Sequence, residues 1–331
     1  MTREPASPLR FLVAPDSFKG TFTAPEVAAA IGAGVEAAGA EADLCPLADG
    51  GEGTAATLGA ALGGSVHRAA VHDPLGRPVE AEFVLLDDGV TAALDTAAAS
   101  GLPLVAPAER DAEAASTAGS GELIAAAIET GAGTVLLAAG GSATTDGGLG
   151  AIEALRASGG LRGARLEVLC DVRTPFEDAA RVFAPQKGAD AAAVARLGER
   201  LQRLAAELPR DPRGLPMGGC AGGLSGGLWA AFDAKLRPGA EYVLGLVEFD
   251  RRLAAADAAI TGEGRADSQS LEGKALGAIV DACARHGKDL HLVVGRNGLD
   301  RNLVGKLPIR SIREAGTLEA LSAAGREIAA G

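Results

Sequence analysis

The chain has 331 residues, enough for about two domains, and its composition, 47% hydrophobic and 22% charged, is that of a globular protein. The formal net charge of −12 argues against binding to nucleic acid through the phosphate backbone. It does not exclude small anionic ligands, because these need only a local positive site.

No run of residues approaches 18 consecutive apolar positions, and the first residues lack the apolar core of a signal peptide. We therefore expect a cytoplasmic protein without a membrane span. The four cysteines have no CxxC spacing, which argues against a zinc site and predicts buried thiols in a reducing compartment. They are Cys45, Cys170, Cys220 and Cys283.

The beginning of the chain alternates between strand and helix signals. The apolar run at residues 11–14 predicts a buried strand. The segment TAPE at 23–26 is a capping-box signature and predicts a helix over residues 24–38. A strand near 43–47 and a helix over 54–62 complete a pattern that is typical of a parallel α/β sheet.

The pattern changes after residue 64. Strand-like runs at 66–72, 79–86 and 90–95 are joined by short turns, which predicts an antiparallel meander and a domain boundary. Residues 209–227 hold three prolines and seven glycines, and we expect a long loop there. The other predicted elements are helices over 121–130, 271–286 and 318–329, a long helix with an apolar stripe that begins at Asp190, and strands at 135–139, 166–170, 258–261, 290–294 and 309–312.

The last third of the chain therefore repeats the alternation of its beginning. We expect one discontinuous α/β domain, residues 1–64 and 254–331, into which residues 65–253 are inserted as a second α/β domain. We also expect the active site to lie in the cleft between these domains.

Four Gly-rich loops that carry ionisable residues each follow a predicted strand. Ligands in open α/β sheets bind beyond the carboxyl ends of the strands, so four such loops favour a ligand site over ordinary turns. The loops cover residues 16–20, 48–54, 140–148 and 262–267.

Lysine is rare in this chain, with six lysines against 25 arginines. Three of them, Lys19, Lys187 and Lys274, stand beside glycines in candidate loops. The compact charge of lysine suits phosphate neutralisation, and small backbone loops such as GGSATTDGG can cradle a phosphate. The alternative is that these lysines are ordinary solvated surface residues.

Several familiar motifs are missing from the sequence. There is no P-loop motif, no GxGxxG after the first strand and no protein-kinase signature. Residues 223–227 match GxSxG, but the segment before Ser225 does not resemble a strand. We therefore expect a flexible or ligand-covering loop there and not a nucleophile elbow.

Five segments of the chain resemble the signature segments of the type 1 glycerate kinase family, in that family's order and over residues 14–275. They read APDSFKG, ADGGEGT, GGSATTDGG, VFAPQKGAD and TGEGRADSQSLEGKA. The resemblance implies a flavodoxin-like parallel α/β domain with an inserted mixed-sheet α/β domain. It also implies ATP-dependent phosphorylation of D-glycerate with Mg²⁺, and we expect 2-phosphoglycerate as the product in preference to 3-phosphoglycerate.

Phosphoryl transfer needs cations and amide donors for the phosphates and a residue that orients or deprotonates the acceptor hydroxyl. We expect Lys19 and Lys187 to act as catalytic cations, Asp171 as the base and Asp267 as a metal ligand. The expected substrate- and phosphate-binding residues are Asp16, Ser17, Asp49, Gly51, Glu52, Gly140, Gly141, Ser142, Thr144, Asp146, Gly262, Glu263, Arg265 and Lys274.

The chain departs from the family pattern in two places. Members of the family read GGSATNDGG where this chain has Thr145. They also carry a longer stretch after that motif, including GGGAL, where this chain has only residues 149–167, and a second shortening lies around 175–180. The alternatives are therefore a kinase of another small hydroxy acid, a non-catalytic nucleotide-binding module, or a GxSxG hydrolase. As partners we expect glycerate and ATP, no nucleic acid and no membrane, for a monomer or homodimer.

Overall fold

The computed structural model describes residues 8–271 and 275–331. The chain divides into two compact units. Unit 1 consists of the described residues of Met1–Asp49 and Ala240–Gly331, and unit 2 is Gly50–Gly239. Among the described residues, no helix is both long enough and apolar enough to cross a membrane.

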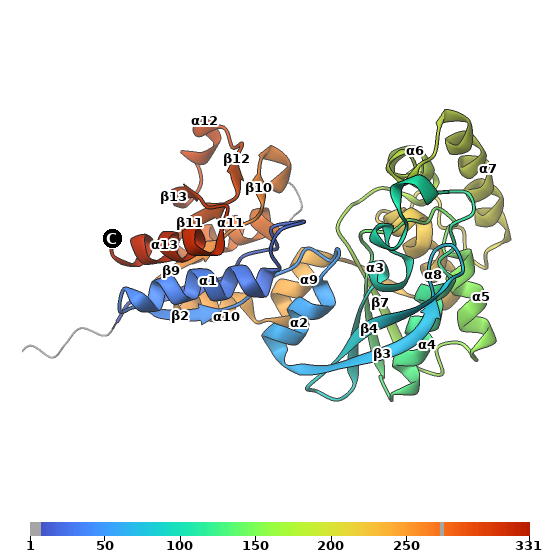
Figure 1. Ribbon diagram of the computed structural model, residues 1–331, viewed down its shortest axis with the longest axis horizontal. Coiled ribbons are helices and arrows are strands. Elements are labelled where there is room, and N and C mark those ends of the chain that lie inside the picture. The colour runs from blue at the N-terminus through green and yellow to red at the C-terminus, as the bar shows by residue number, and fades with distance from the viewer. Residues whose placement is uncertain (1–7, 272–274) are drawn as a thin grey trace, which may run out of the picture. The chain divides into compact units, whose positions relative to one another are not determined.

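Unit 1 contains a five-stranded sheet in the order β13-β11-β9-β1-β2, in which all neighbouring strands are parallel. Counted within the unit, this is the 2-1-3-4-5 order of a flavodoxin-like fold, as predicted. Figure 1 shows β1 and β2, in blue, in one sheet with the orange and red strands from the end of the chain. The strands are β1 (Arg10–Val13), β2 (Glu41–Leu44), β9 (Ala258–Thr261), β11 (Asp289–Val294) and β13 (Ile309–Glu314).

Helices α1 and α13 pack together on this sheet. Thr23 caps α1, since its side chain accepts a hydrogen bond from the Glu26 amide while the Glu26 carboxylate accepts one from the Thr23 amide. Buried Ile31 of α1 and Leu321 of α13 share a core with Val293 of β11. The unit also has a small parallel sheet, β10-β12. Its remaining elements are α1 (Ala24–Ala37), α9 (Gly239–Leu246), α10 (Phe249–Ala255), β10 (Arg265–Ala266), α11 (Ala275–His286), β12 (Arg296–Asn297), α12 (Arg301–Val304) and α13 (Leu318–Ala329).

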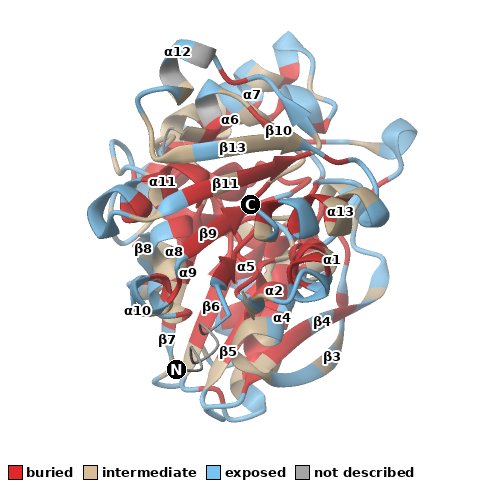
Figure 2. Cartoon of the chain, turned by 90° about the vertical axis from the view of Figure 1, so that its left-hand side faces the viewer, coloured by how far each residue is buried: buried red, intermediate tan, exposed pale blue. Residues whose placement is uncertain are grey.

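Unit 2 contains a six-stranded mixed sheet in the order β3-β4-β5-β6-β7-β8. The first two pairings are antiparallel, which confirms the predicted meander, and the other three are parallel. Figure 2 shows red, buried stretches in β4, toward its C-terminal end, whereas the edge strand β3 is largely pale blue. The strands are β3 (Gly64–His72), β4 (Pro78–Leu86), β5 (Thr91–Asp95), β6 (Thr134–Ala138), β7 (Arg165–Cys170) and β8 (Lys235–Pro238).

The helices of unit 2 form two cores. One lies between the sheet and the buried faces of α4, α5 and α8, and a smaller one joins α6 and α7 around Phe176. Asp190 caps α7, and its predicted apolar stripe contributes buried Leu197, Leu201 and Leu204 to the smaller core. The helices are α2 (Thr54–Leu62), α3 (Thr96–Ser100), α4 (Ala118–Glu129), α5 (Leu149–Ala157), α6 (Ala179–Phe183), α7 (Ala191–Glu207) and α8 (Leu224–Phe232).

Three features differ from the sequence-based expectations. The units change at residues 49/50 and 239/240, earlier than the expected boundaries. The first difference arises because α2 contacts β4 and β5 of unit 2. Strand β2 ends at Leu44 and does not extend to residue 47. The predicted loop at 209–227 is wrong at its end, where a 3-10 turn and α8 begin.

Candidate active site

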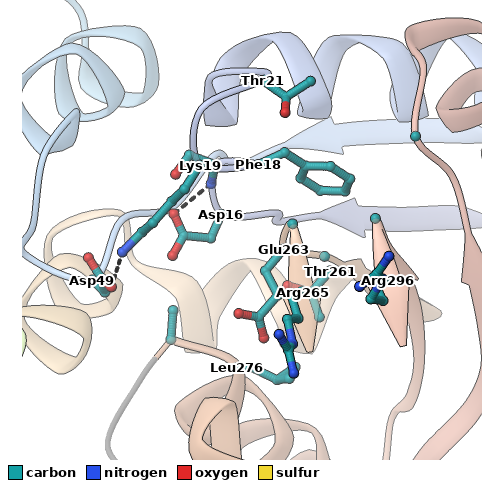
Figure 3. Close-up of a pocket in the computed structure, with 16 residues that line it drawn as sticks. Asp16, Phe18, Lys19, Thr21, Asp49, Thr261, Glu263, Arg265, Leu276 and Arg296 are labelled. Atoms are coloured by element: carbon teal, nitrogen blue, oxygen red, sulfur yellow. Dashed lines mark hydrogen bonds and ion pairs between the residues drawn. The ribbon is translucent and has the colours of Figure 1, made fainter. Parts of the chain in front are cut away.

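A pocket of about 480 Å³ lies in unit 1 at the carboxyl ends of β1, β9 and β11. Strands β1 and β9 are the neighbours at which the strand order reverses, which is where flavodoxin-like folds bind their ligands. The loop after β1 supplies Asp16, Ser17 and Lys19, and the loop after β9 supplies Gly262 and Glu263. Asp49, from the predicted loop at 48–54, lines it too, so the pocket gathers residues of three of the four predicted loops (Figure 3).

Three charged residues lie together on one side of this pocket. Lys19 Nζ lies 3.3 Å from Asp49 Oδ2, and the Asp16 carboxylate accepts a hydrogen bond from the Ser17 amide. Removal from water, followed by repulsion from Asp49, raises the pKa of Asp16 to about 7. A carboxyl group with that pKa can both accept and release a proton near neutral pH.

The other side of the pocket carries two arginines. Arg265 of β10 lines the pocket together with Arg296 of β12, which the sequence analysis did not single out. Arg265 Nε lies 3.6 Å from Asp267 Oδ2. Asp267, the expected metal ligand, is not among the pocket's lining residues. Lys274 lies outside the described residues.

A second pocket, of about 250 Å³, lies in unit 2. Gly140, Gly141 and Ser142 of the loop after β6 line it, with Asp171 at the end of β7 and Lys187. The unit 2 pocket therefore contains a Gly-rich loop, a carboxylate and a cation, the three components expected of a phosphate-binding site.

Lys187 is buried in the wall of the unit 2 pocket, with 2% of its surface exposed. Its ammonium donates hydrogen bonds to Ser142 Oγ at 3.0 Å and to the Thr144 carbonyl at 2.5 Å. Burial lowers the pKa of Lys187 to about 7, although Asp146 acts against this. An anion entering the pocket would raise that pKa again and would be held by the restored charge.

The predicted loop at 48–54 lies beside the loop after β6. A Cβ atom added to Gly140 would stand 2.6 Å from Gly51 Cα, and one added to Gly141 would stand 3.0 Å from Glu52 Oε2. Asp95 holds this loop by accepting hydrogen bonds from the amides of Gly53 and Ala55. Gly51 and Glu52 thus belong to the surroundings of the unit 2 pocket.

Two residues that we expected to bind ligand are buried within the Gly-rich loop and do not line the unit 2 pocket. The Asp146 carboxylate is 1% exposed and accepts hydrogen bonds from the amides of Thr117, Gly148 and Gly150. Thr144 is fully buried, and only its carbonyl faces Lys187. Neither residue is among those lining the unit 2 pocket, so both shape the Gly-rich loop from within.

Ser225 of the GxSxG segment lies in the first turn of α8 and is fully buried. Its hydroxyl donates to the Met217 carbonyl at 2.6 Å. The expectation of a flexible or ligand-covering loop at Ser225 is therefore wrong. A nucleophile elbow is absent too, since a 3-10 turn (Cys220–Gly223) and not a strand precedes the serine.

Arg296 is the pocket residue that sequence reasoning missed, although the sequence contains a signal for it. The segment Gly-Arg-Asn-Gly follows the buried strand β11 directly, as the other predicted loops follow their strands. Phe183 and Gln186, which line the unit 2 pocket, were not singled out either, although both lie in the segment VFAPQKGAD. Both pockets suit anionic ligands, because each presents cations beside small backbone loops.

Comparisons with known proteins agree with this chemistry. A family model described as the glycerate kinase family matches residues 11–159 and 157–323. A Bacillus subtilis glycerate kinase is 37% identical, covering 89% of this chain and 87% of its own, and an Escherichia coli glycerate 2-kinase is 35% identical, covering 87% and 85%. A solved structure from Salmonella typhimurium LT2, described as a candidate glycerate kinase 2, has a TM-score of 0.85 at 33% identity and covers 98% of each chain.

Proposed function

The chain belongs to the glycerate kinase family, whose members are phosphotransferases with an alcohol acceptor, and from this premise we propose that it transfers the γ-phosphoryl group of ATP to D-glycerate. We propose 2-phosphoglycerate as the product, which is supported by the similarity to the E. coli glycerate 2-kinase. The observation that carries the proposal is the unit 1 pocket, where Asp16 lies with both cations and carboxylates at the ligand-binding edge of the sheet.

The two pockets supply what phosphoryl transfer requires, which is mostly positioning and neutralisation of charge. Lys19 and Lys187 would neutralise phosphate or carboxylate charge, and the amides of Gly140 and Gly141 would donate to phosphate oxygens. In this proposal both pockets serve one reaction, so the loss of either should abolish turnover.

A carboxylate accepts the proton of the acceptor hydroxyl as the new oxygen–phosphorus bond forms and the bond to ADP breaks. Asp171, at the end of β7 in the unit 2 pocket, is the base we propose. Asp16 is the second candidate, because its pKa of about 7 suits a proton acceptor near neutral pH. The turnover of Asp171→Asn and Asp16→Asn distinguishes the two, since loss of the base should lower kcat by about 10²- to 10⁴-fold, the usual contribution of a general base.

The described residues do not build a resident metal site. Among them there is no group of three or more His, Cys, Asp or Glu side chains placed to hold a metal ion, and Asp267 lies against Arg265. We therefore propose that Mg²⁺ enters as its complex with ATP, as is usual where phosphates provide most of the ligands. No step of the mechanism proposed here depends on a protein-bound metal.

The direct test is an ADP-release assay with ATP, Mg²⁺ and a panel of small hydroxy acids, with the phosphorylated position assigned by NMR. We expect release to depend on D-glycerate and the phosphate to be on its 2-hydroxyl. A preference for another hydroxy acid would favour the alternative suggested by the shortened segment at residues 149–167. ATP binding without turnover on any acceptor would contradict the proposal.

We also propose that the protein acts in the cytoplasm as a monomer or homodimer. Four free, buried cysteines support a reducing compartment. Light scattering on the preparation used for the assay distinguishes the two oligomeric states.

A further inference from the structure

We propose that Arg265 and Arg296 form a paired-guanidinium site that binds one anionic group, a carboxylate or a phosphate, in the unit 1 pocket. The inference rests on the proposed function and deepens it, because it names the part of the pocket that holds the charged end of a substrate. It also adds Arg296 to the binding residues.

The small sheet places the two arginines opposite one another. In the parallel pairing of β10 with β12, Arg265 stands in register with Arg296, and Ala266 with Asn297. Side chains in register on neighbouring strands project from the same face, and the strands lie about 4.8 Å apart. Both arginines line the same pocket, and Ala266, which projects oppositely, is fully buried.

Backbone hydrogen bonds hold this register firmly. The Gly295 amide donates to the Glu263 carbonyl at 3.1 Å and the Arg296 amide to the Gly264 carbonyl at 3.0 Å. A Cβ atom on Gly295 would stand 2.5 Å from that Gly264 oxygen, so the close approach requires glycine. The Cα positions of the two arginines are therefore fixed relative to one another.

The charge of the pair is incompletely balanced by the protein. Arg265 faces Asp267 at 3.6 Å, beyond hydrogen-bond distance, and no carboxylate in the described part of the chain lies within ion-pair distance of Arg296. Neighbouring like charges destabilise a sheet unless something offsets them. An anion that accepts hydrogen bonds from both guanidinium groups would offset this repulsion. The oxygen atoms of a planar carboxylate or a tetrahedral phosphate match the forked donors of arginine.

Figure 3 shows where such an anion would lie in the pocket. Arg296 stands on one side and Asp16, Lys19 and Asp49 stand on the other, with Glu263 and Arg265 between them. A substrate held by its charged end at the arginines would extend its remaining atoms toward Asp16. The pair thus orients the substrate, and its loss should weaken binding more than it slows chemistry.

The test uses Arg296→Gln, which removes the charge, and Arg296→Lys, which keeps the charge but not the fork. Arg310→Gln is the matched control, because Arg310 is an exposed arginine of unit 1 outside the pocket. We expect Arg296→Gln to raise KM about 10- to 100-fold for one substrate, the usual range for a charge-assisted hydrogen bond, with kcat little changed. Arg296→Lys should be intermediate. A rise in KM for D-glycerate identifies a carboxylate, and a rise in KM for ATP identifies a phosphate.

Calorimetric titration of the same variants with D-glycerate, ADP and inorganic phosphate requires no turnover. If the wild type lacks kinase activity but Arg296→Gln still weakens binding of one of these anions, the proposed function fails and the paired site stands. If Arg296→Gln and Arg310→Gln match the wild type in both KM values and all three titrations, the paired site is refuted.

Discussion

At the scale of single residues, Asp16 is a group of the unit 1 pocket whose charge state changes near neutral pH. Its pKa of about 7 results from removal from water and from repulsion by Asp49. Only the ionised form can accept a proton or balance Lys19, so we expect kcat/KM to fall as the pH drops below about 7. The pH dependence of kcat/KM measures this directly.

The cause of the shift can be tested by removing Asp49. Asp49→Asn abolishes the repulsion and releases Lys19 toward Asp16, so the pKa of Asp16 should fall and the acidic limb should move to lower pH. Asp250→Asn, a change at an exposed carboxylate on α10, should leave the limb in place. If the acidic limb of the kcat/KM profile is unchanged in Asp49→Asn, another group, on the enzyme or on ATP, determines the pH dependence.

The choice of lysine at position 19 can be tested by a change that keeps the charge. Guanidinium is wider and forked, so Lys19→Arg should misplace the charge beside Asp49 and lower turnover by about 10²-fold, the effect of a displacement near 1 Å. Lys235→Arg is the control, because Lys235 forms an exposed ion pair with Asp233 and lines neither the unit 1 pocket nor the unit 2 pocket. Equal, near-wild-type turnover in both variants would make Lys19 an ordinary surface cation.

The candidate site was predictable from sequence where loop chemistry follows a strand. Lys19, Gly262 and Arg265 line a pocket because parallel strands bring their carboxyl ends to one edge. The sequence could not show that Asp146 is structural and not ligand-binding. An acidic residue in a Gly-rich loop has the same sequence context whether its carboxylate accepts hydrogen bonds from backbone amides or faces solvent. Arg296 follows a buried strand in the same way but was not singled out, and its position opposite Arg265 depends on the pairing of β12 with β10.

At the scale of elements, helices α1 and α13 meet through glycine. A Cβ atom on Gly34 of α1 would overlap the Ser322 carbonyl, and one on Gly325 of α13 would overlap the Ile31 carbonyl. Gly34→Ala should therefore destabilise the protein by about 2 kcal/mol or more, the scale of overpacking, despite alanine's better helix propensity. Thermal or denaturant unfolding measures the loss.

The control is a glycine in a helix with free space around it. Gly198 of α7 has no atom within 4 Å of an added Cβ, so Gly198→Ala should leave stability unchanged or raise it by up to about 1 kcal/mol. If Gly34→Ala proved as stable as Gly198→Ala, α1 and α13 would not be in close contact in solution.

Helix α8 shows where element prediction from local sequence fails. Its residues LSGGLWAAF carry two glycines in the first turn and follow a Gly-rich segment, so composition alone indicates a loop. A Cβ atom on Gly227 would overlap the Gly147 carbonyl, and one on Gly226 would stand 2.6 Å from Phe176. The glycines are therefore there for close packing, and tertiary contacts stabilise a helix that its propensity disfavours.

At the scale of the whole molecule, the alternation of strand and helix signals predicted the fold class. It did not predict the boundaries between the two units. Strand and helix signals at both ends of the chain predicted one discontinuous α/β domain, and strands from both ends do form one sheet. Helix α2 continues the same local alternation, yet it packs on β4 and β5 of unit 2. No local sequence signal shows whether α2 packs on the sheet of unit 1 or on that of unit 2, because its amphipathic pattern is the same in both cases.

The folding stability of the whole molecule provides a test of the raised pKa of Asp16. Asp16 keeps its proton to about pH 7 in the folded state but loses it near pH 4 when unfolded. Between these values the unfolded state binds fewer protons, so this group's contribution to folding stability falls as the pH rises and is lowest above pH 7. Asparagine does not ionise, so Asp16→Asn lacks this loss of stability. Its free energy of unfolding should therefore rise relative to the wild type progressively from pH 4 to pH 7.

For this half-buried carboxyl we expect the gain to reach about 1–2 kcal/mol at pH 7, discounted for solvent from the 1.4 kcal/mol that each pKa unit represents. Thermal melts of both proteins from pH 4 to pH 8 measure it, with Asp281→Asn, at an exposed position on α11, as the control. Groups elsewhere, such as Lys187 and His291, titrate equally in both proteins and cancel in the difference. A more stable but inactive Asp16→Asn would show that the fold tolerates a destabilising carboxyl because the reaction requires it. A difference between the two proteins that does not vary with pH would contradict the raised pKa of Asp16 and, with it, the reason for considering Asp16 as the second candidate base.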